Sequence, residues 1–520
     1  MRSIPAALTW EMMRRGCWPL AGAFIGALGL PMLIFAALQR DGALDPAAEG
    51  TLLMQVILTH VSLLALGAGT FAAVGAPSRM FTMPVSTPGI VLSHLIPSGI
   101  LAAALWSVCV VVLNRVLPLE WPVSGPALFG AVVVPLVLAT SWYSDKSVWL
   151  PVLLGVAAGA PFLWMKSRYG GMFSNPDHSW RQVSGSDCLV LTAMGASAYF
   201  IGLAGVARQR RQEPLRCPQF LEWLARAMDG RPAENLRFRS AEEAQLWLEW
   251  RSKGILLPGV MISFGLVAFA GWILFSRDTA DLLQGVIGAG MILPLVSGIV
   301  GLVIGNYGPT DGNSVMGPWT ASRPMTSQTL ARVVLKTQFR AVAICTVLWQ
   351  LALWSVSLIA GDSVHRHDLP PSSLAAANWF LPWVSASVGT LVCLTGRSNW
   401  IGIGFTVTAL STLVTGMLIR WVSGEMASVF FQGMAMALSI ASLGGAVMSF
   451  MAAHRRGLVS SRVVAACGLV VAVVTPIVLW QLQQSAMLKF VPALLAIAVV
   501  GWCVAPFAMA PLAVAWNRNR

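Results

Sequence analysis

Long apolar runs recur along the whole chain, and they constrain its fold more than any other feature. A helix needs about 20 mostly apolar residues to cross a bilayer. Only 11% of the residues are charged, against about 25% in soluble domains, so charges are too few to coat a water-facing surface. We predict an all-α, polytopic integral membrane protein with about 14 transmembrane helices. The runs lie at 18–38, 52–75, 92–113, 127–143, 147–165, 188–207, 255–275, 282–305, 334–360, 376–394, 399–419, 429–453, 462–480 and 490–514.

The basic residues predict an orientation for these runs. If the N-terminus is cytoplasmic and each run crosses once, 25 of the 34 Lys and Arg residues fall on the cytoplasmic side and nine fall outside. Cytoplasmic loops of membrane proteins carry this excess of Lys and Arg. We therefore predict a multi-pass protein of the plasma (inner) membrane with both termini cytoplasmic. Topology also explains the net charge of +13, so nucleic acid is not an expected partner.

The sequence repeats itself weakly, with a period near 240 residues. A Glu, a basic residue and a Gly precede both the first and the seventh apolar run, as Glu11, Arg15 and Gly16 and again as Glu249, Lys253 and Gly254. A proline turn follows the second run of each half. Its residues are Arg79, Pro84, Val85, Ser86 and Thr87 in the first half, and Arg323, Pro324, Met325, Thr326 and Ser327 in the second. We call 84–87 the first proline turn and 324–327 the second.

Six runs per half is an even number, so the repeats would be parallel, related by an axis along the membrane normal. We predict a first six-helix half at 1–207 and a second at 255–454. Between them, 208–254 would be a cytoplasmic linker that ends in an amphipathic helix. Ser240 and Glu243 have the spacing of a capping box at the start of that helix. Residues 455–520 would form an extra C-terminal helix pair.

At these motifs the chain resembles the membrane subunits of type 2 ATP-binding-cassette exporters. In that family an amphipathic elbow helix precedes six spanning helices, and a short cytoplasmic coupling helix lies between the second and third. The resemblance implies two such permease units fused over about 1–454. It makes the Glu–Gly motifs elbow segments and the two proline turns the contacts with an ATPase. The implied partner is an ATPase dimer at the cytoplasmic face, which would hold the ATP and magnesium.

The sequence lacks the motifs that mark several kinds of enzyme and nucleotide-binding site. The chain contains no G-x-x-x-x-G-K-[ST] phosphate loop, no H-E-x-x-H and no G-x-S-x-G. We therefore expect no enzyme activity and no cofactor in this chain. No Asp or Glu lies deep in an apolar run, which disfavours ion-coupled exchange through a membrane-embedded acid. The eight cysteines include no C-x-x-C pair, and no metal site is predicted.

Alternatives stay open. A secondary transporter or lipid-linked-substrate flippase with 14 helices is the second interpretation, and a membrane-embedded lipid-modifying enzyme the third. His60, inside the second run, is a candidate pathway residue or a packed histidine. The outer loop at 361–369 contains His365, His367 and Asp368, and the sequence does not decide whether it binds metal. It also leaves open the substrate, its direction, the oligomeric state and the role of the C-terminal pair.

Overall fold

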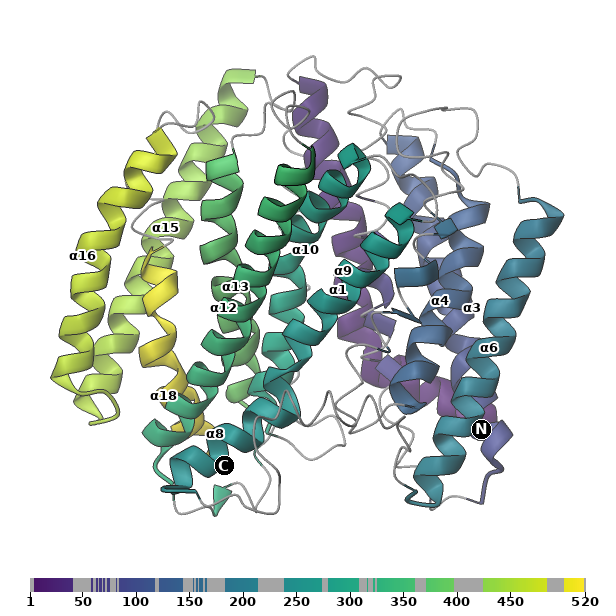
Figure 1. Cartoon of the computed structure of the whole chain (residues 1–520), viewed down its shortest axis with the longest axis horizontal. Helices are drawn as coiled ribbons and strands as arrows, with labels where there is room; N and C mark the ends of the chain where they lie inside the picture. The colour runs from purple at the N-terminus through teal and green to yellow at the C-terminus, as the bar shows by residue number, and fades with distance from the viewer. Residues whose placement is uncertain are drawn as a thin grey trace. The chain divides into compact units, whose positions relative to one another are not determined.

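The computed structural model is helical in every element it describes, with no strand among the described residues (Figure 1). The described parts are 4–40, 84–116, 121–143, 183–213, 238–273, 279–307, 325–360, 371–396, 424–483 and 500–518, with isolated residues at 58–81, 153–165, 316, 321 and 322. The predicted all-α class agrees with this.

Among the described residues, five helices are long and apolar enough to cross a membrane. They lie at Thr87–Val116, Ser124–Tyr143, Gly185–Arg210, Ala241–Ala270 and Ser327–Val356. Shorter apolar helices lie at Gly16–Gly29, Val296–Gly305, Phe380–Leu394 and Ser461–Ile477. The length and composition of these helices are compatible with a membrane protein. The count of fourteen stays a prediction, because the run at 399–419 and most of those at 52–75 and 147–165 lie outside the described residues.

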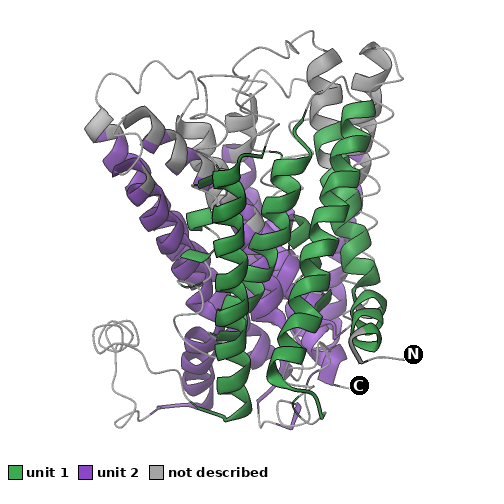
Figure 2. Cartoon of the chain, turned by 90° about the vertical axis from the view of Figure 1, so that its right-hand side faces the viewer, with its two compact units in different colours: residues 1–216, 399–427 green, residues 217–398, 428–520 purple. Residues whose placement is uncertain are grey.

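The chain divides into two compact units (Figure 2). The first unit contains Met1–Arg216 and Asn399–Ala427, and the second contains Cys217–Ser398 and Ser428–Arg520. The break after Arg216 falls inside the predicted linker 208–254.

The first unit is built around three long helices that pack on one another. α3 packs against α1 and α4, and α6 packs against α3 and α4. Glycine allows close approach: a Cβ on Gly99 of α3 would lie 2.5 Å from the carbonyl oxygen of Ala131, and one on Gly205 of α6 would lie 2.7 Å from the backbone nitrogen of Tyr143. Small residues of this kind let helix backbones meet in membranes, where apolar burial alone does not hold helices together. The bounds are α1 (Ile4–Arg40), α3 (Thr87–Val116), α4 (Ser124–Tyr143) and α6 (Gly185–Arg210).

The described part of the second unit begins with α8, at the place where the sequence predicted an amphipathic helix. The Ser240 hydroxyl accepts a hydrogen bond from the Glu243 N–H at 3.2 Å, which caps α8. The Glu243 carboxylate accepts from the N–H of Arg239 at 2.8 Å, one residue before the position a capping box would use. The elements are α8 (Ala241–Glu249), η4 (Trp250–Gly254), α9 (Leu256–Gly271), α10 (Thr279–Gly305), α12 (Ser327–Ala360), α13 (Pro371–Leu394), α15 (Gly424–Arg455), α16 (Ser461–Gln483) and α18 (Pro506–Arg518).

Among the described helices of the second unit, α10 and α13 pack most closely. A Cβ on Gly301 would lie 2.1 Å from the carbonyl oxygen of Ala386, and one on Gly389 would lie 2.2 Å from that of Gly298. The Thr390 hydroxyl adds a hydrogen bond to the carbonyl of Gly301 at 3.0 Å. Glycine on both helices therefore sets the distance between their backbones.

The C-terminal helix α18 packs in the second unit as α6 packs in the first. It packs against α12 and α13, as α6 packs against α3 and α4. The hairpin of α15 and α16 lies beside it (Figure 1). Buried Ala453, Val459 and Ala508 join the base of this hairpin to α18.

Candidate functional site

The first proline turn leads directly into α3. Pro84 and Ser86 are exposed, and α3 begins at Thr87. The Ser86 hydroxyl accepts from the N–H of Gly89 at 3.3 Å, and its carbonyl accepts from the N–H of Ile90 at 3.0 Å. Ser86 is therefore the residue that caps α3, which satisfies one of the amides left open at a helix start.

The second proline turn leads into α12 in the same way. α12 begins at Ser327, and the Thr326 hydroxyl accepts from the N–H of Thr329 at 3.1 Å. The Thr326 carbonyl accepts from the N–H of Leu330 at 3.0 Å. Thr326 is exposed, like Ser86. The two hydroxyl residues that the repeat aligned thus make the same pair of hydrogen bonds to residues three and four positions later.

An arginine holds each turn through the backbone carbonyl that precedes the cap. In the first unit Arg210 Nη1 donates to the carbonyl of Val85 at 3.1 Å and to the hydroxyl of Thr87 at 3.1 Å. In the second unit the guanidinium of Arg518 donates to the carbonyl of Met325. Val85 and Met325 are partners in the repeat, so the same carbonyl is held in both units. We call these two contacts the arginine clamps.

The residue before each clamp arginine is an amide that binds the end of a neighbouring helix. The side chain of Gln209 donates to the carbonyl of Trp142, near the end of α4. The side chain of Asn517 donates to the carbonyl of Leu394, the last residue of α13, at 3.0 Å. Asn517 is 3% exposed and also accepts from the N–H of Met316 at 3.0 Å. Carbonyls at a helix end lack partners inside the helix, so these amides satisfy groups that would otherwise need water.

The start of α8 is tied to α12 just beyond the second turn. Lys336 Nζ lies 2.7 Å from one oxygen of Glu242, and Arg332 Nη1 lies 3.5 Å from the other. The hydrogen bond from Lys336, with the charge of Arg332, holds the pKa of the Glu242 carboxyl below its ordinary value. All three side chains are partly exposed, so water screens these ion pairs.

The second elbow motif, Glu249, Lys253 and Gly254, lies where α8 connects to α9. Lys253 Nζ pairs with Glu249 at 3.3 Å and donates to the carbonyl of Asn306, just past the end of α10, at 2.7 Å. Gly254 is buried, and a Cβ there would lie 2.9 Å from Thr337 of α12. These contacts hold the elbow segment against α10 and α12.

The first elbow motif lies within α1. Glu11 is partly buried, Gly16 is buried, and a Cβ on Gly16 would lie 2.2 Å from the Cβ of Ala73. Glycine therefore permits a close helix contact at Gly16, as at Gly254. The N-terminal part of α1 lies at an angle to the rest of the helix (Figure 1). α1 contains Pro19 and Pro31, and a proline inside a helix is a usual cause of such a bend. The side chain of Arg15 lies outside the described residues.

The described residues cover only part of the predicted site. Arg79 and Arg323, which precede the two turns, lie outside them, as do Pro324 of the second turn and the candidate pathway residue His60. The loop at 361–369 also lies outside. The role assigned to each of these residues stays a prediction.

Sequence reasoning missed the two clamp arginines and the amides before them. The period of the repeat could not find them, because Arg210 lies 125 residues after Val85 whereas Arg518 lies 193 after Met325. The sequence did contain a short signal: each helix ends on Val-Ala, any residue, an amide and Arg, at 206–210 and at 514–518.

Comparison with known proteins adds no family to this geometry. No protein-family model, no curated protein and no solved structure matches the chain.

Proposed function

We propose that this chain is the membrane subunit of an ATP-driven transporter, and that a separate ATPase acts on its two proline turns. One observation supports this most directly: both turns have the same cap and the same arginine clamp, although they belong to different units. Two equivalent exposed turns suit a partner that is itself a dimer, because each subunit of such a partner needs one contact.

The clamps suggest how a force on a turn would travel. Each turn is joined by its cap to a long apolar helix, and by its arginine to the end of another helix in the same unit. A displacement of the first turn would therefore move α3 and α6 together, and one of the second would move α12 and α18 together. The ATPase would favour one arrangement of these helices by binding it more tightly than the other. The chain would contribute a path for substrate and no bond-breaking step.

We also propose a different composition for the second permease unit. The helix that clamps the second turn is α18, and α18 packs as α6 does. The second unit is then completed by α18, and the hairpin of α15 and α16 is the additional pair. This proposal replaces the predicted boundaries 255–454 and 455–520, which took 429–453 as the sixth helix.

Single cysteines at the two turns test the proposed function. Ser86→Cys and Thr326→Cys place a thiol on each turn, in a background where exposed Cys17 and Cys188, and Cys217 of the predicted linker, are Ser. A short bifunctional thiol reagent applied to native membranes is expected to join both positions to one polypeptide. Mass spectrometry of that product should find a phosphate-loop sequence, and the purified chain alone should hydrolyse no ATP.

Ser186→Cys is the matched control, because Ser186 is exposed in the first turn of α6, at the opposite end of that helix from Arg210. α6 has 26 residues and is about 39 Å long at about 1.5 Å per residue, long enough to put its two ends on opposite sides of a bilayer. An impermeant thiol reagent added outside cells should label Ser186→Cys and neither turn. Labelling of the turns from outside would refute the proposal, and so would a cross-linked partner without a phosphate loop.

A further inference from the structure

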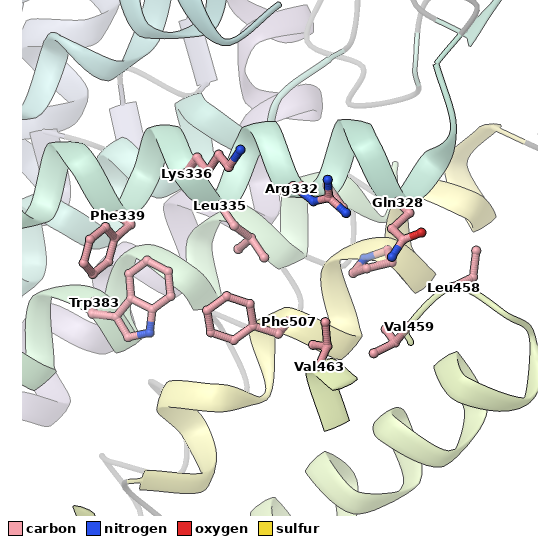
Figure 3. Close-up of a pocket in the computed structure, with 12 residues that line it drawn as sticks. Gln328, Arg332, Leu335, Lys336, Phe339, Trp383, Leu458, Val459, Val463 and Phe507 are labelled. Atoms are coloured by element: carbon pink, nitrogen blue, oxygen red, sulfur yellow. The ribbon is translucent and has the colours of Figure 1, made fainter. Parts of the chain in front are cut away.

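A groove of about 370 Å³ opens in the second unit beside the start of α12. It lies between the first turns of α12, Trp383 of α13, Phe507 and Pro511 of α18, and the connection from α15 to α16 (Figure 3). Its volume is within the usual range of ligand pockets, about 300–1,000 Å³.

The α12 wall of the groove consists of two parallel stripes. Ala331, Leu335 and Phe339 follow one another at intervals of four residues and form an apolar stripe. Gln328, Arg332 and Lys336 have the same spacing and form a polar stripe beside it. Residues four apart on a helix lie on one face, so each stripe is continuous along α12. The groove therefore has an apolar wall and a cationic edge along the same helix.

The far wall is apolar as well. Trp383, Phe507 and Val463 lie across from the α12 stripes (Figure 3), and Leu458 and Val459 close the end near α16. Phe507 is 40% exposed, so an aromatic face of this wall is open to a ligand.

The charge around the groove is strongly positive. Arg332 and Lys336 share the single carboxylate of Glu242, which leaves one positive charge without a countercharge in that cluster. Arg455, Arg456 and Arg462 are exposed on the connection that carries Leu458 and Val459. The sequence has no Asp or Glu at 327–360, 371–394, 451–483 or 506–518, the stretches that supply the lining.

We propose that this groove binds one anionic phospholipid, with its phosphate at Arg332 and Lys336 and an acyl chain along Leu335, Phe339 and Phe507. Basic pockets between transmembrane helices bind anionic headgroups. A small soluble anion would gain nothing from the apolar walls, and a zwitterionic lipid would gain little from the excess charge. The inference does not depend on an ATPase partner and is tested without one.

The test uses the full-length chain purified in a mild detergent. It is mixed with equal amounts of phosphatidylglycerol and phosphatidylethanolamine of identical acyl chains. Native mass spectrometry then measures how much of each lipid stays bound to the protein. We expect the anionic lipid to be retained preferentially. Because each cation near an anionic headgroup contributes about fivefold in affinity, Arg332→Gln with Lys336→Gln should weaken its binding by about 25-fold.

Three further variants make the result specific to the groove. Arg115→Gln with Arg211→Gln removes the same charge from exposed positions of the first unit, and should leave lipid retention unchanged. Val463→Trp fills the groove without altering charge, and should lower retention of both lipids. Glu242→Gln breaks the same ion pairs but frees both cations, so it should strengthen binding of phosphatidylglycerol.

Each contrary result overturns the proposal. Equal retention of the two lipids would remove the role of the cations, and an unchanged Val463→Trp would place the lipid elsewhere. Weaker binding in Glu242→Gln would mean that the cations act only by docking α8. Binding of soluble glycerol phosphate as tightly as the lipid would show a free-phosphate site instead.

Discussion

Removing one arginine clamp should loosen one proline turn and leave the other intact. Arg210→Met keeps the aliphatic stem and a good helix former while it deletes the donors to Val85 and Thr87. Hydrogen bonds from charged donors contribute about 1.5–3 kcal/mol each when buried. Because Arg210 is partly exposed, we take about 1–2 kcal/mol for the pair.

Amide hydrogen exchange measures this loss at the start of α3. The N–H groups of Gly89 and Ile90 are bonded to Ser86, so they exchange when the cap opens. A loss of about 1–2 kcal/mol raises the population of the open form, and with it the exchange rate, by about 5- to 30-fold. Arg210→Lys should give an intermediate rate, because an ammonium lacks the fork that reaches both acceptors.

The chain supplies two controls for this experiment. Arg211→Met removes the adjacent arginine, which is 65% exposed and paired only across the surface with Glu213 at 3.2 Å, and it should leave the rates at Gly89 and Ile90 unchanged. Arg518→Met should accelerate exchange at the start of α12 and not of α3. Equal rates in Arg210→Met and Arg211→Met would refute the clamp.

Two further substitutions test packing that supports the site. Gly301→Ala should destabilise the chain by about 1–3 kcal/mol, because its Cβ would lie 2.1 Å from a carbonyl oxygen of α13. Gly445→Ala is the control: no atom lies within 4 Å of its Cβ, so it should be neutral or stabilising. Thermal unfolding in detergent compares the two variants, and equal midpoints would contradict the packing. Asn517→Leu removes two buried hydrogen bonds and leaves their backbone partners unpaired, so it should lower stability by about 2–4 kcal/mol in the same assay, and a midpoint within a degree of wild type would contradict it.

The proline turns could be located from the sequence because their information is local. Proline fixes φ, a hydroxyl residue caps a helix, and an apolar run follows. The repeat aligned Ser86 with Thr326, and the structure gives both the same capping hydrogen bonds. The start of α8 at Ser240 was found for the same reason. Signals of this kind need only three or four consecutive residues, so they survive in a sequence that repeats weakly.

The partners of these turns could not be located, because they are fixed by tertiary packing. α6 and α18 share only the short pattern Val-Ala-x-amide-Arg at their ends, and apolar spans all have similar composition. Hydropathy therefore counts helices without deciding which helix packs on which. Counting six runs per half predicts 429–453 as the sixth helix of the second unit, and such a count has no means of finding the contact that α18 makes with the second turn.

The unequal spacing of the two clamps argues that the contact, and not the sequence position, is what each unit needs. A chance contact would not be expected to recur on the same carbonyl of both turns when the arginine follows 125 residues later in one unit and 193 in the other. The recurrence is explained if a clamp can come from any helix that packs on α3 and α4, or on α12 and α13. The end of that helix must present an amide and then an arginine. Gln209→Asn together with Asn517→Gln exchanges the two amides and keeps both arginines. This double variant should then preserve the hydrogen-exchange protection at the starts of α3 and α12. Lost protection would instead tie each amide to its own neighbouring helix.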